Sequence, residues 1–295
     1  MQHQDNLLEV EYSQLNTRFN KEHGALWTLV NQKQVVPCAS PELLKDLGEH
    51  HRAITNSQGS LLVDNTLHKI RYSVLASVTP GVFNLGGQLA LFRQLIRDQD
   101  RESLLQYAIT CIDVIFPRIH HFDLPLTTIT LLQGDALGGG LEAALSSDIV
   151  IAERHCQLGF PEILFNLFPG MGAYSLIARK VGPQFAEKMI FGGELYSAEE
   201  LYKAGLIDIL AEDGKGVKAV NDYIRKQERH ENGYLAIQKV RNRLNPVTYQ
   251  ELIDITTIWV DTALKLGEKD LKVMDRFVRT QERQFLQPPM ERIGA

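Results

Sequence analysis

The chain has 295 residues, of which 44% are hydrophobic and 23% are charged. This length and composition suit one large domain or two modest ones, which bury enough apolar surface to fold without disulfides or a structural metal. With 31 Lys and Arg against 36 Asp and Glu, the formal net charge is -5. The chain therefore lacks the concentrated positive charge that a dedicated nucleic-acid-binding protein needs.

The cysteines and the N-terminal residues predict where the protein resides. Cys38, Cys111 and Cys156 stand far apart and form no CxxC pair, so we expect buried free thiols in a reducing compartment rather than disulfides or a zinc site. The first residues are polar and acidic, unlike a signal peptide. No run approaches the roughly 18 to 20 apolar residues that span a bilayer. We expect a cytoplasmic protein without a membrane anchor.

Strands and helices alternate in the first part of the chain. Ser40 and Pro41 provide a helix cap and a proline at the first helical position. The order of strand, helix and strand implies parallel pairing and an α/β fold. Composition and periodicity predict strands at 24–31, 69–78, 126–132 and 148–152, helices at 40–51 and in two parts of 88–119, a glycine-rich turn at 134–140 and a helix starting at 141–146.

From Ala173 onward the pattern predicts helices almost without a break. The polar, glycine-containing stretch 211–215 separates the α/β pattern from the helical one, so we place a boundary between residues 1–212 and 213–295. The alternating charges of residues 265–283 predict a solvated helix face. The predicted C-terminal helices are 217–229, 231–244, 247–266 and 268–285.

Three consecutive glycines, Gly138 to Gly140, precede a short apolar helix that contains one carboxylate. Consecutive glycines lower local stability, so this backbone is expected to adopt an unusual conformation or to approach another group closely. Glu142 follows among leucines and alanines. A helix that is apolar on nearly all sides is buried, and a carboxylate in it must be paired, hydrogen-bonded or functional. A solvated or ion-paired glutamate is the alternative interpretation.

Glu162 is the only ionisable residue of the apolar stretch 158–172. Apolar surroundings raise the pKa of a carboxyl group and suit it to proton transfer near neutral pH. An exposed turn residue after Pro161 is the alternative. Two carboxyls whose surroundings separate their pKa values would provide an acid and a base.

Other uses of the glycine-rich turn fit less well. A Walker loop needs Lys followed by Ser or Thr after its last glycine, and both are absent here. Gly138, Gly140 and Ala143 match the dinucleotide fingerprint G-x-G-x-x-A, but residues 134–137 intervene between the strand and the turn. We therefore expect a helix N-terminus whose free amides face an oxygen that gains negative charge, as in a thioester enolate.

Four motifs between residues 83 and 208 resemble those of the crotonase, or enoyl-CoA hydratase/isomerase, superfamily, in the expected order and at the expected separations. Residues 83–89 (FNLGGQL) resemble its F-x-A-G-A-D-L bend, and residues 134–152 resemble its G-x-A-x-G-G-G-x-E helix start and the strand after it. Residues 158–172 resemble F-x-x-P-E-x-x-x-G-x-x-P-G-x-G, and residues 196–208 resemble A-x-E-A-x-x-x-G-L-V-D. The resemblance implies a crotonase-type ββα spiral core over residues 1–212. The α-helical C-terminal region, 213–295, would cover an acyl pocket and make oligomer contacts.

The resemblance also implies roles for single residues. The amides of Gly87 and Gly139 would form an oxyanion hole, with Gly86 adjacent, and Glu142 and Glu162 would be the catalytic carboxylates. For the bend at Gly86 and Gly87, spacing alone is equally compatible with a plain turn.

Two further residues are expected to line the acyl pocket, because the C-terminal helices of crotonases cover it. These are Met171 and Trp259, which are apolar and adaptable enough to contact a fatty chain. An ordinary core position is the alternative for Trp259. His120 and His121 have no partner at a convincing ligand spacing, so we expect helix-end or surface residues and no metal site.

The chain departs from the family pattern at positions that bear on the recognition of coenzyme A phosphates. Gly87 and Gln88 replace the usual Ala-Asp, Leu158 replaces a phenylalanine, and residues 88–91 lack the basic residues often found after the bend. The stretch 78–91 (VTPGVFNLGGQLAL), the long helical lead to His120 and His121, and residues 132–148 (LQGDALGGGLEAALSSD) resemble a subgroup, the diffusible-signal-factor synthases. These enzymes make a cis-2-unsaturated fatty acid signal from 3-hydroxyacyl-acyl carrier protein by dehydration and thioester hydrolysis. The expected substrate is thus an acyl carrier protein or coenzyme A thioester, with no other cofactor.

The subgroup implies partners as well. Besides acyl carrier protein, it implies a homotrimer and, by analogy, the receiver domain of a sensor kinase. Two alternatives remain open, an ordinary enoyl-CoA hydratase of fatty-acid metabolism and a non-catalytic crotonase-fold regulator that binds a partner protein.

Overall fold

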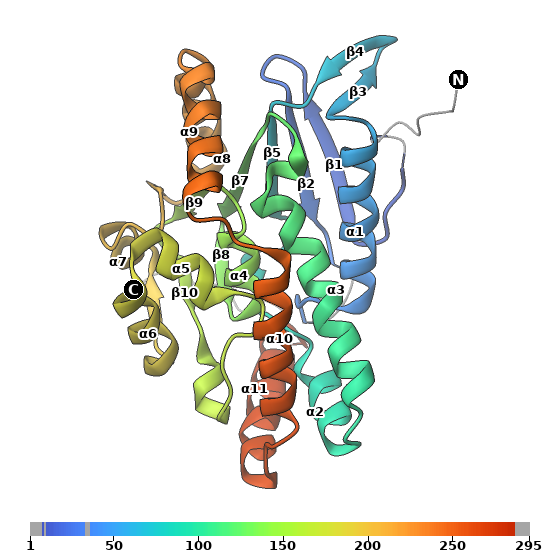
Figure 1. Cartoon of the computed structure of the whole chain (residues 1–295), viewed down its shortest axis with the longest axis vertical. Coiled ribbons are helices and arrows are strands. Elements are labelled where there is room, and N and C mark those ends of the chain that lie inside the picture. The colour runs from blue at the N-terminus through green and yellow to red at the C-terminus, as the bar shows by residue number, and fades with distance from the viewer. Residues whose placement is uncertain (1–7, 9, 33–35, 287–295) are drawn as a thin grey trace.

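The computed structural model describes residues 8, 10–32 and 36–286, which form an α/β fold (Figure 1). The strands are β1 (Leu15–Asn20), β2 (Ala25–Val30), β3 (Ser60–Val63), β4 (Thr66–Lys69), β5 (Tyr72–Ser77), β6 (Gly81–Asn84), β7 (Thr127–Leu132), β8 (Gly134–Leu137), β9 (Ile149–Glu153), β10 (Gln157–Gly159), β11 (Leu195–Ser197) and β12 (Ile209–Ala211). The α-helices are α1 (Pro41–Asn56), α2 (Leu89–Arg97), α3 (Arg101–Ile119), α4 (Gly139–Leu145), α5 (Ala173–Val181), α6 (Pro183–Gly192), α7 (Ala198–Lys203), α8 (Gly216–Glu228), α9 (Glu231–Leu244), α10 (Tyr249–Ala263) and α11 (Glu268–Leu286). Two 3-10 helices, η1 (His121–Asp123) and η2 (Pro161–Phe165), complete the order.

The larger sheet has the strand order β1-β2-β5-β7-β9-β12. All of its pairs are parallel except β1 with β2. Helices connect the successive parallel strands, as parallel pairing requires. The predicted α/β class is therefore confirmed, as are the strands at β2, β5, β7 and β9 and the division of residues 88–119 into α2 and α3.

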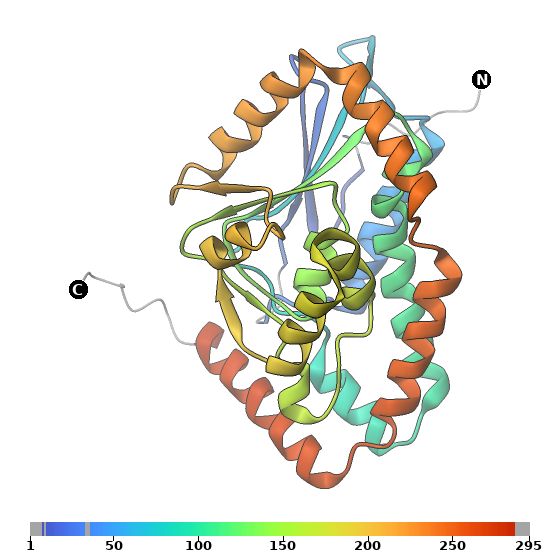
Figure 2. The same cartoon turned by 60° about the vertical axis from the view of Figure 1, so that its left-hand side comes forward.

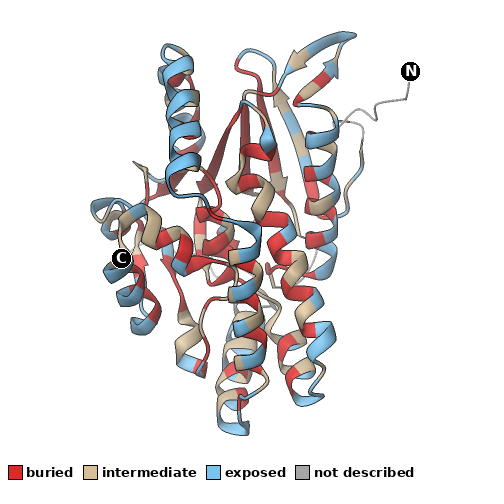
Figure 3. Cartoon of the chain, in the orientation of Figure 1, coloured by how far each residue is buried: buried red, intermediate tan, exposed pale blue. Residues whose placement is uncertain are grey.

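Both faces of this sheet are buried, because successive side chains of a strand point to opposite faces and helices cover each of them. Figure 3 shows the burial along the strands and on the inner sides of the helices. α4 covers one face and α8 the other. Leu132, Val150 and Ala152 share a hydrophobic cluster with α4, whereas Ile129, Leu131 and Ile151 share one with Val220 and Ile224 of α8.

The second sheet, of order β11-β10-β8-β6, corrects one prediction. Residues 134–140 were expected to form a turn, but residues 134–137 form strand β8 between β6 and β10. A Cβ on Gly134 would lie 2.2 Å from the backbone of Gly81 and Val82. The glycine therefore allows two backbones to approach closely. It does not mark a turn.

The helical C-terminal region begins after β12. Within the described residues the pattern from Ala173 onward is interrupted by two three-residue strands, β11 and β12, which the sequence did not predict. α8 packs on β7, β9 and β12, α10 packs along α3, and α11 packs against α2 and η2. Figure 2 shows α11 along the outer edge of the molecule. The described helices include none long and apolar enough to cross a membrane.

The histidines at the end of α3 are less exposed than the sequence suggested. His121 is buried and its Nε2 lies 2.8 Å from Asp148 Oδ1, while His120 Nε2 lies 2.7 Å from the Val247 carbonyl oxygen. Both therefore hold the end of α3 to neighbouring elements. The expected helix-end position is confirmed for both, whereas the alternative of a surface position is wrong for His121. The three cysteines are free and buried, as predicted.

Candidate active site

Two glycine-rich bends, one after β6 and one before α4, meet at the centre of the site. A Cβ placed on Gly139 would lie 3.6 Å from both the Gly87 nitrogen and the Gly86 Cα. Gly138 has φ +51 and ψ -127, a conformation that is essentially restricted to glycine, and it caps α4. The first amides of a helix have no partner within it. Gly139 is the first residue of α4, so its amide has no partner within the helix, and its backbone lies beside that of Gly87.

Glu142 lies in the first turn of α4 and is 1% exposed. Its Oε1 accepts hydrogen bonds from the backbone amides of Met171, at 2.8 Å, and Ala173, at 2.9 Å. Burial raises the pKa of Glu142 to about 7, and the two amide hydrogen bonds oppose that increase. Its hydrogen bonds are therefore with backbone donors, which favour its ionised form.

Glu162 belongs to η2, directly after Pro161. The residue is partly exposed as a whole, but its Oε2 is buried and has no hydrogen-bond partner among the described residues. Burial, followed by repulsion from Glu142, raises the pKa of Glu162 to about 8. A Cβ on Gly138 would lie 2.3 Å from Glu162 Oε1, so the carboxyl group rests against the glycine-rich bend.

A single pocket contains all of the residues that the sequence predicted for the site. It is lined by Glu142, Glu162, Gly86, Gly87, Gly139, Met171 and Trp259, and its volume is about 750 Å³ including the space open to solvent. Ligand pockets commonly combine an apolar lining with a few polar groups, as this one does. The structure therefore brings together side chains from segments far apart in the chain.

Aromatic side chains form one wall of the pocket. The ring of Phe92 contacts those of Tyr107 and Trp259 edge to face, each at a centroid separation of 5.1 Å. Phe165 and Phe277 form a second edge-to-face pair at 5.7 Å. These rings give the pocket an extended apolar surface, of the kind that an apolar chain would contact.

The sequence did not predict Phe92, Tyr107, Phe165 or Phe277 as lining residues, nor Gln281, which also lines the pocket. They belong to α2, α3, η2 and α11, and their apolar pattern alone is that of ordinary core residues. The spacing of Phe277 and Gln281 could have predicted that both lie on one face of α11, because residues four apart lie on the same side of a helix.

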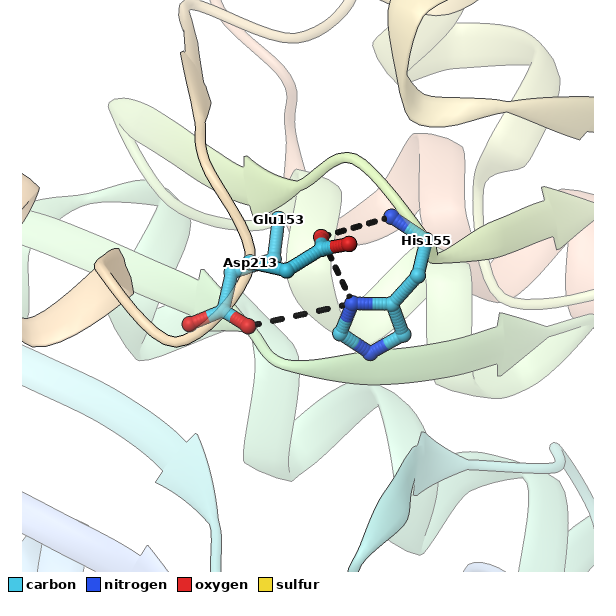
Figure 4. A group of neighbouring side chains, drawn as sticks. All are labelled: Glu153, His155 and Asp213. Atoms are coloured by element: carbon cyan, nitrogen blue, oxygen red, sulfur yellow. Dashed lines mark hydrogen bonds and ion pairs between the residues drawn. The ribbon is translucent and has the colours of Figure 1, made fainter. Parts of the chain in front are cut away.

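One group of side chains in the described part of the chain brings possible metal ligands within 4.8 Å of one another, namely Glu153, His155 and Asp213 (Figure 4). None of them lines the pocket. Glu153 is 3% exposed, and its two oxygens accept hydrogen bonds from the amides of Gly214 and Gly216, each at 2.9 Å. His155 Nδ1 lies 2.9 Å from Asp213 Oδ1. These contacts hold the β12–α8 loop against β9, which accounts for the group without an ion.

Comparisons with known proteins identify the family of the chain. A family model described as enoyl-CoA hydratase/isomerase matches residues 54–287. The chain is 28% identical over 236 residues to "Probable enoyl-CoA hydratase 2, mitochondrial" of Arabidopsis thaliana, covering 80% of this chain and 72% of that protein. It is 32% identical over 130 residues to 2,3-dehydroadipyl-CoA hydratase of Escherichia coli, covering 44% of this chain and 49% of that protein.

Solved structures show the same fold. Enoyl-CoA hydratase from Bacillus halodurans superposes with a TM-score of 0.74 at 22% identity, covering 90% of this chain and 100% of the other. Pseudomonas aeruginosa DspI superposes with a TM-score of 0.60 at 20% identity, covering 92% of this chain and 96% of the other. The α/β spiral fold expected from the sequence motifs is therefore confirmed.

Proposed function

Because the chain belongs to the enoyl-CoA hydratase/isomerase family, we propose that it adds or removes water across the C2–C3 bond of an acyl thioester. The observation that carries this proposal is the pair of buried carboxyls, Glu142 and Glu162, whose pKa values are raised to about 7 and about 8 beside the Gly87 and Gly139 backbone. Groups with such pKa values exchange protons readily at neutral pH.

The thioester carbonyl is proposed to bind between the Gly87 and Gly139 amides. Two N–H donors aimed at this oxygen stabilise the negative charge that develops when C2 loses or gains a proton. The apolar wall that contains Trp259 and Met171 would then hold the acyl chain.

The surroundings of the two carboxyls indicate which one is ionised and which one carries the proton. Glu142 accepts two amide hydrogen bonds, which favour its ionised form, whereas the unpartnered buried oxygen of Glu162 favours the protonated form. In hydration, Glu142 takes a proton from water as the water oxygen bonds to C3, and Glu162 delivers its proton to C2. Dehydration is the reverse, in which C2 returns its proton to Glu162 and the 3-hydroxyl leaves as water with the proton held by Glu142.

We also propose the finer activity to which the sequence motifs point, release of a free cis-2-enoic acid signal from a 3-hydroxyacyl-acyl carrier protein. After dehydration a second water would bond to C1, and the carrier thiol would leave with a proton, so that the two steps together consume no net water. The motifs around residues 78–91 support this choice, because residues 88–91 lack basic side chains that would hold coenzyme A phosphates. By the same resemblance we propose a homotrimer in the cytoplasm.

Mass spectrometry of the products tests the proposal. Purified protein would be incubated with 3-hydroxydodecanoyl-acyl carrier protein, with the Glu162→Gln variant as the matched control. Free cis-2-dodecenoic acid from the wild type alone supports the signal synthase. Reversible hydration with the thioester intact leaves an ordinary hydratase, and no turnover on carrier-protein or coenzyme A thioesters contradicts both and favours a binding protein.

A further inference from the structure

The outer face of α11 carries a row of positively charged side chains. These residues recur at intervals of three and four, so that at 3.6 residues per turn they fall within an arc of about 80° and extend for about 21 Å. All are exposed, and none makes an ion pair with another described residue. We call this row the basic stripe, and its members are Lys269, Lys272, Arg276, Arg279 and Arg283.

The acidic residues of α11 do not neutralise the basic stripe. Glu268 and Asp275 lie to one side of it and face α2, where Asp275 pairs with Arg93 and both acids pair with Arg97. Glu282 follows Asp275 by seven residues and thus lies on the same side of the helix. Asp270 lies beyond the other edge of the stripe, where its Oδ2 accepts a hydrogen bond from the Gly267 amide at 2.9 Å. The stripe therefore presents concentrated positive charge on a chain whose net charge is -5.

The opposite face of α11 belongs to the pocket. Leu271 and Met274 are buried, and Phe277 and Gln281 line the pocket beside Glu162. Gln281 also lines a neighbouring groove that contains Gly87. One helix thus has its inner face at the site of the thioester and its outer face free for a partner.

We propose that the basic stripe docks an acidic protein that carries the acyl thioester on a flexible arm. This inference rests on the proposed function, because it assumes that the pocket takes a thioester. Charge complementarity argues for the partner, and the groove beside Gln281 gives its arm a route to Gly87. A length of about 21 Å suits a protein surface rather than one small phosphate group.

An anionic membrane fits the stripe less well. A helix that lies in a membrane interface directs its apolar face into the lipid. In α11 the apolar face is turned inward, since Leu271 and Met274 are buried and Phe277 packs against Phe165. The stripe is left with cations alone, so we favour an acidic protein.

A charge-reversal variant tests the proposal. The test variant changes Lys272, Arg276 and Arg279 to Glu, and the control changes Arg229, Lys239 and Arg243 to Glu. The control cations are also exposed and outside the ion pairs of the described residues, and both variants have the same net charge. α9, which carries two of the control positions, lies at the opposite end of the molecule from α11 (Figure 1).

Two measurements are compared, the binding of fluorescently labelled holo-acyl carrier protein and kcat/KM for thioesters of one acyl group. We expect the test variant to lose about tenfold or more in both binding and kcat/KM with the carrier protein, more so at low salt. It should remain within about twofold of wild type on the neutral N-acetylcysteamine thioester, since charge pairing at a docking surface does not act there. The control variant should behave as wild type on both.

The docking proposal is overturned if the test variant binds the carrier protein as the wild type does, or if the control variant loses as much binding and kcat/KM as the test variant. It is also overturned if the test variant loses as much kcat/KM with the coenzyme A thioester, or if it loses binding only to anionic phospholipid vesicles. Turnover of the N-acetylcysteamine thioester without carrier-protein binding by the wild type refutes docking and leaves the proposed function intact. Binding of the carrier protein that depends on the stripe, without turnover of any thioester, supports docking and refutes the proposed function.

Discussion

Replacing Glu162 with glutamine is expected to stabilise the protein at neutral pH while it removes activity. Burial and, to a smaller extent, repulsion from Glu142 raise the pKa of Glu162 from 4.5 to about 8. Between these two values the folded protein binds more protons than the unfolded chain, so its free energy of unfolding falls as the pH rises. Glutamine does not ionise, and the variant therefore avoids this loss.

The magnitude follows from the width of this interval. Each pH unit within it corresponds to about 1.4 kcal/mol, so the two units from pH 5 to pH 7 amount to about 2.7 kcal/mol for a fully buried group. Glu162 is partly exposed as a residue, and solvent screening reduces the effect. We expect the advantage of the variant to grow by about 1–2 kcal/mol from pH 5 to pH 7.

Urea unfolding at pH 5, 6 and 7 measures this change for wild type, Glu162→Gln and the exposed control Glu22→Gln. The control shows the effect of replacing an exposed carboxylate by an amide. The Glu162→Gln variant should also lose about 10²-fold or more in kcat, because a general acid or base contributes about 10²–10⁴-fold. If wild type and Glu162→Gln differ in stability by the same amount at pH 5 and pH 7, the raised pKa of Glu162 is refuted. The proposed assignment of the proton to Glu162 is then refuted as well.

Three further predictions follow from the same geometry. Gly138→Ala should reduce kcat at least about tenfold, because it strains a φ of +51 and places a Cβ 2.3 Å from Glu162 Oε1; steady-state kinetics near the wild-type values would contradict this. Burial alone would lower the pKa of His155, but its contact with Asp213 raises the pKa overall. Asp213→Asn should therefore destabilise the protein by a few tenths of a kcal/mol at pH 5–6 and by less at pH 8, as measured by urea unfolding. Trp259→Ala should cost about 3–5 kcal/mol of stability and raise KM for long acyl chains more than for short ones, and an equal change for butyryl and dodecanoyl thioesters would remove Trp259 from the acyl pocket.

The two carboxylates could be predicted from sequence because their signal is local. Glu142 and Glu162 each interrupt an apolar stretch, which predicts apolar neighbours around the carboxyl group. Their hydrogen-bond partners could not be predicted in the same way. The amides of Met171 and Ala173 reach Glu142 only because α5 packs against α4.

The missed strand has a similar origin. Residues 134–137 contain a glycine and an aspartate, which locally favour a turn. Gly134 is in a strand because β6 passes within a distance that no side chain would permit, and β6 lies about fifty residues earlier in the chain. Three-residue strands such as β10 and β11 are likewise defined by their neighbours, because so few residues show no periodicity of their own.

The aromatic wall of the pocket left a trace in the sequence that could not be interpreted without the fold. A Cβ on Gly87 would lie 2.4 Å from Phe92 Cζ, and one on Gly170 would lie 2.4 Å from Trp259 Cγ. Each glycine thus marks where an aromatic ring rests on the backbone, and the two rings touch each other at 5.1 Å. The sequence shows that these positions have no side chain, but a glycine in a bend is equally consistent with a turn. Only the packing of α10 along α3, beside α2, decides between the two, and it makes these glycines part of the surface that we propose binds the acyl chain.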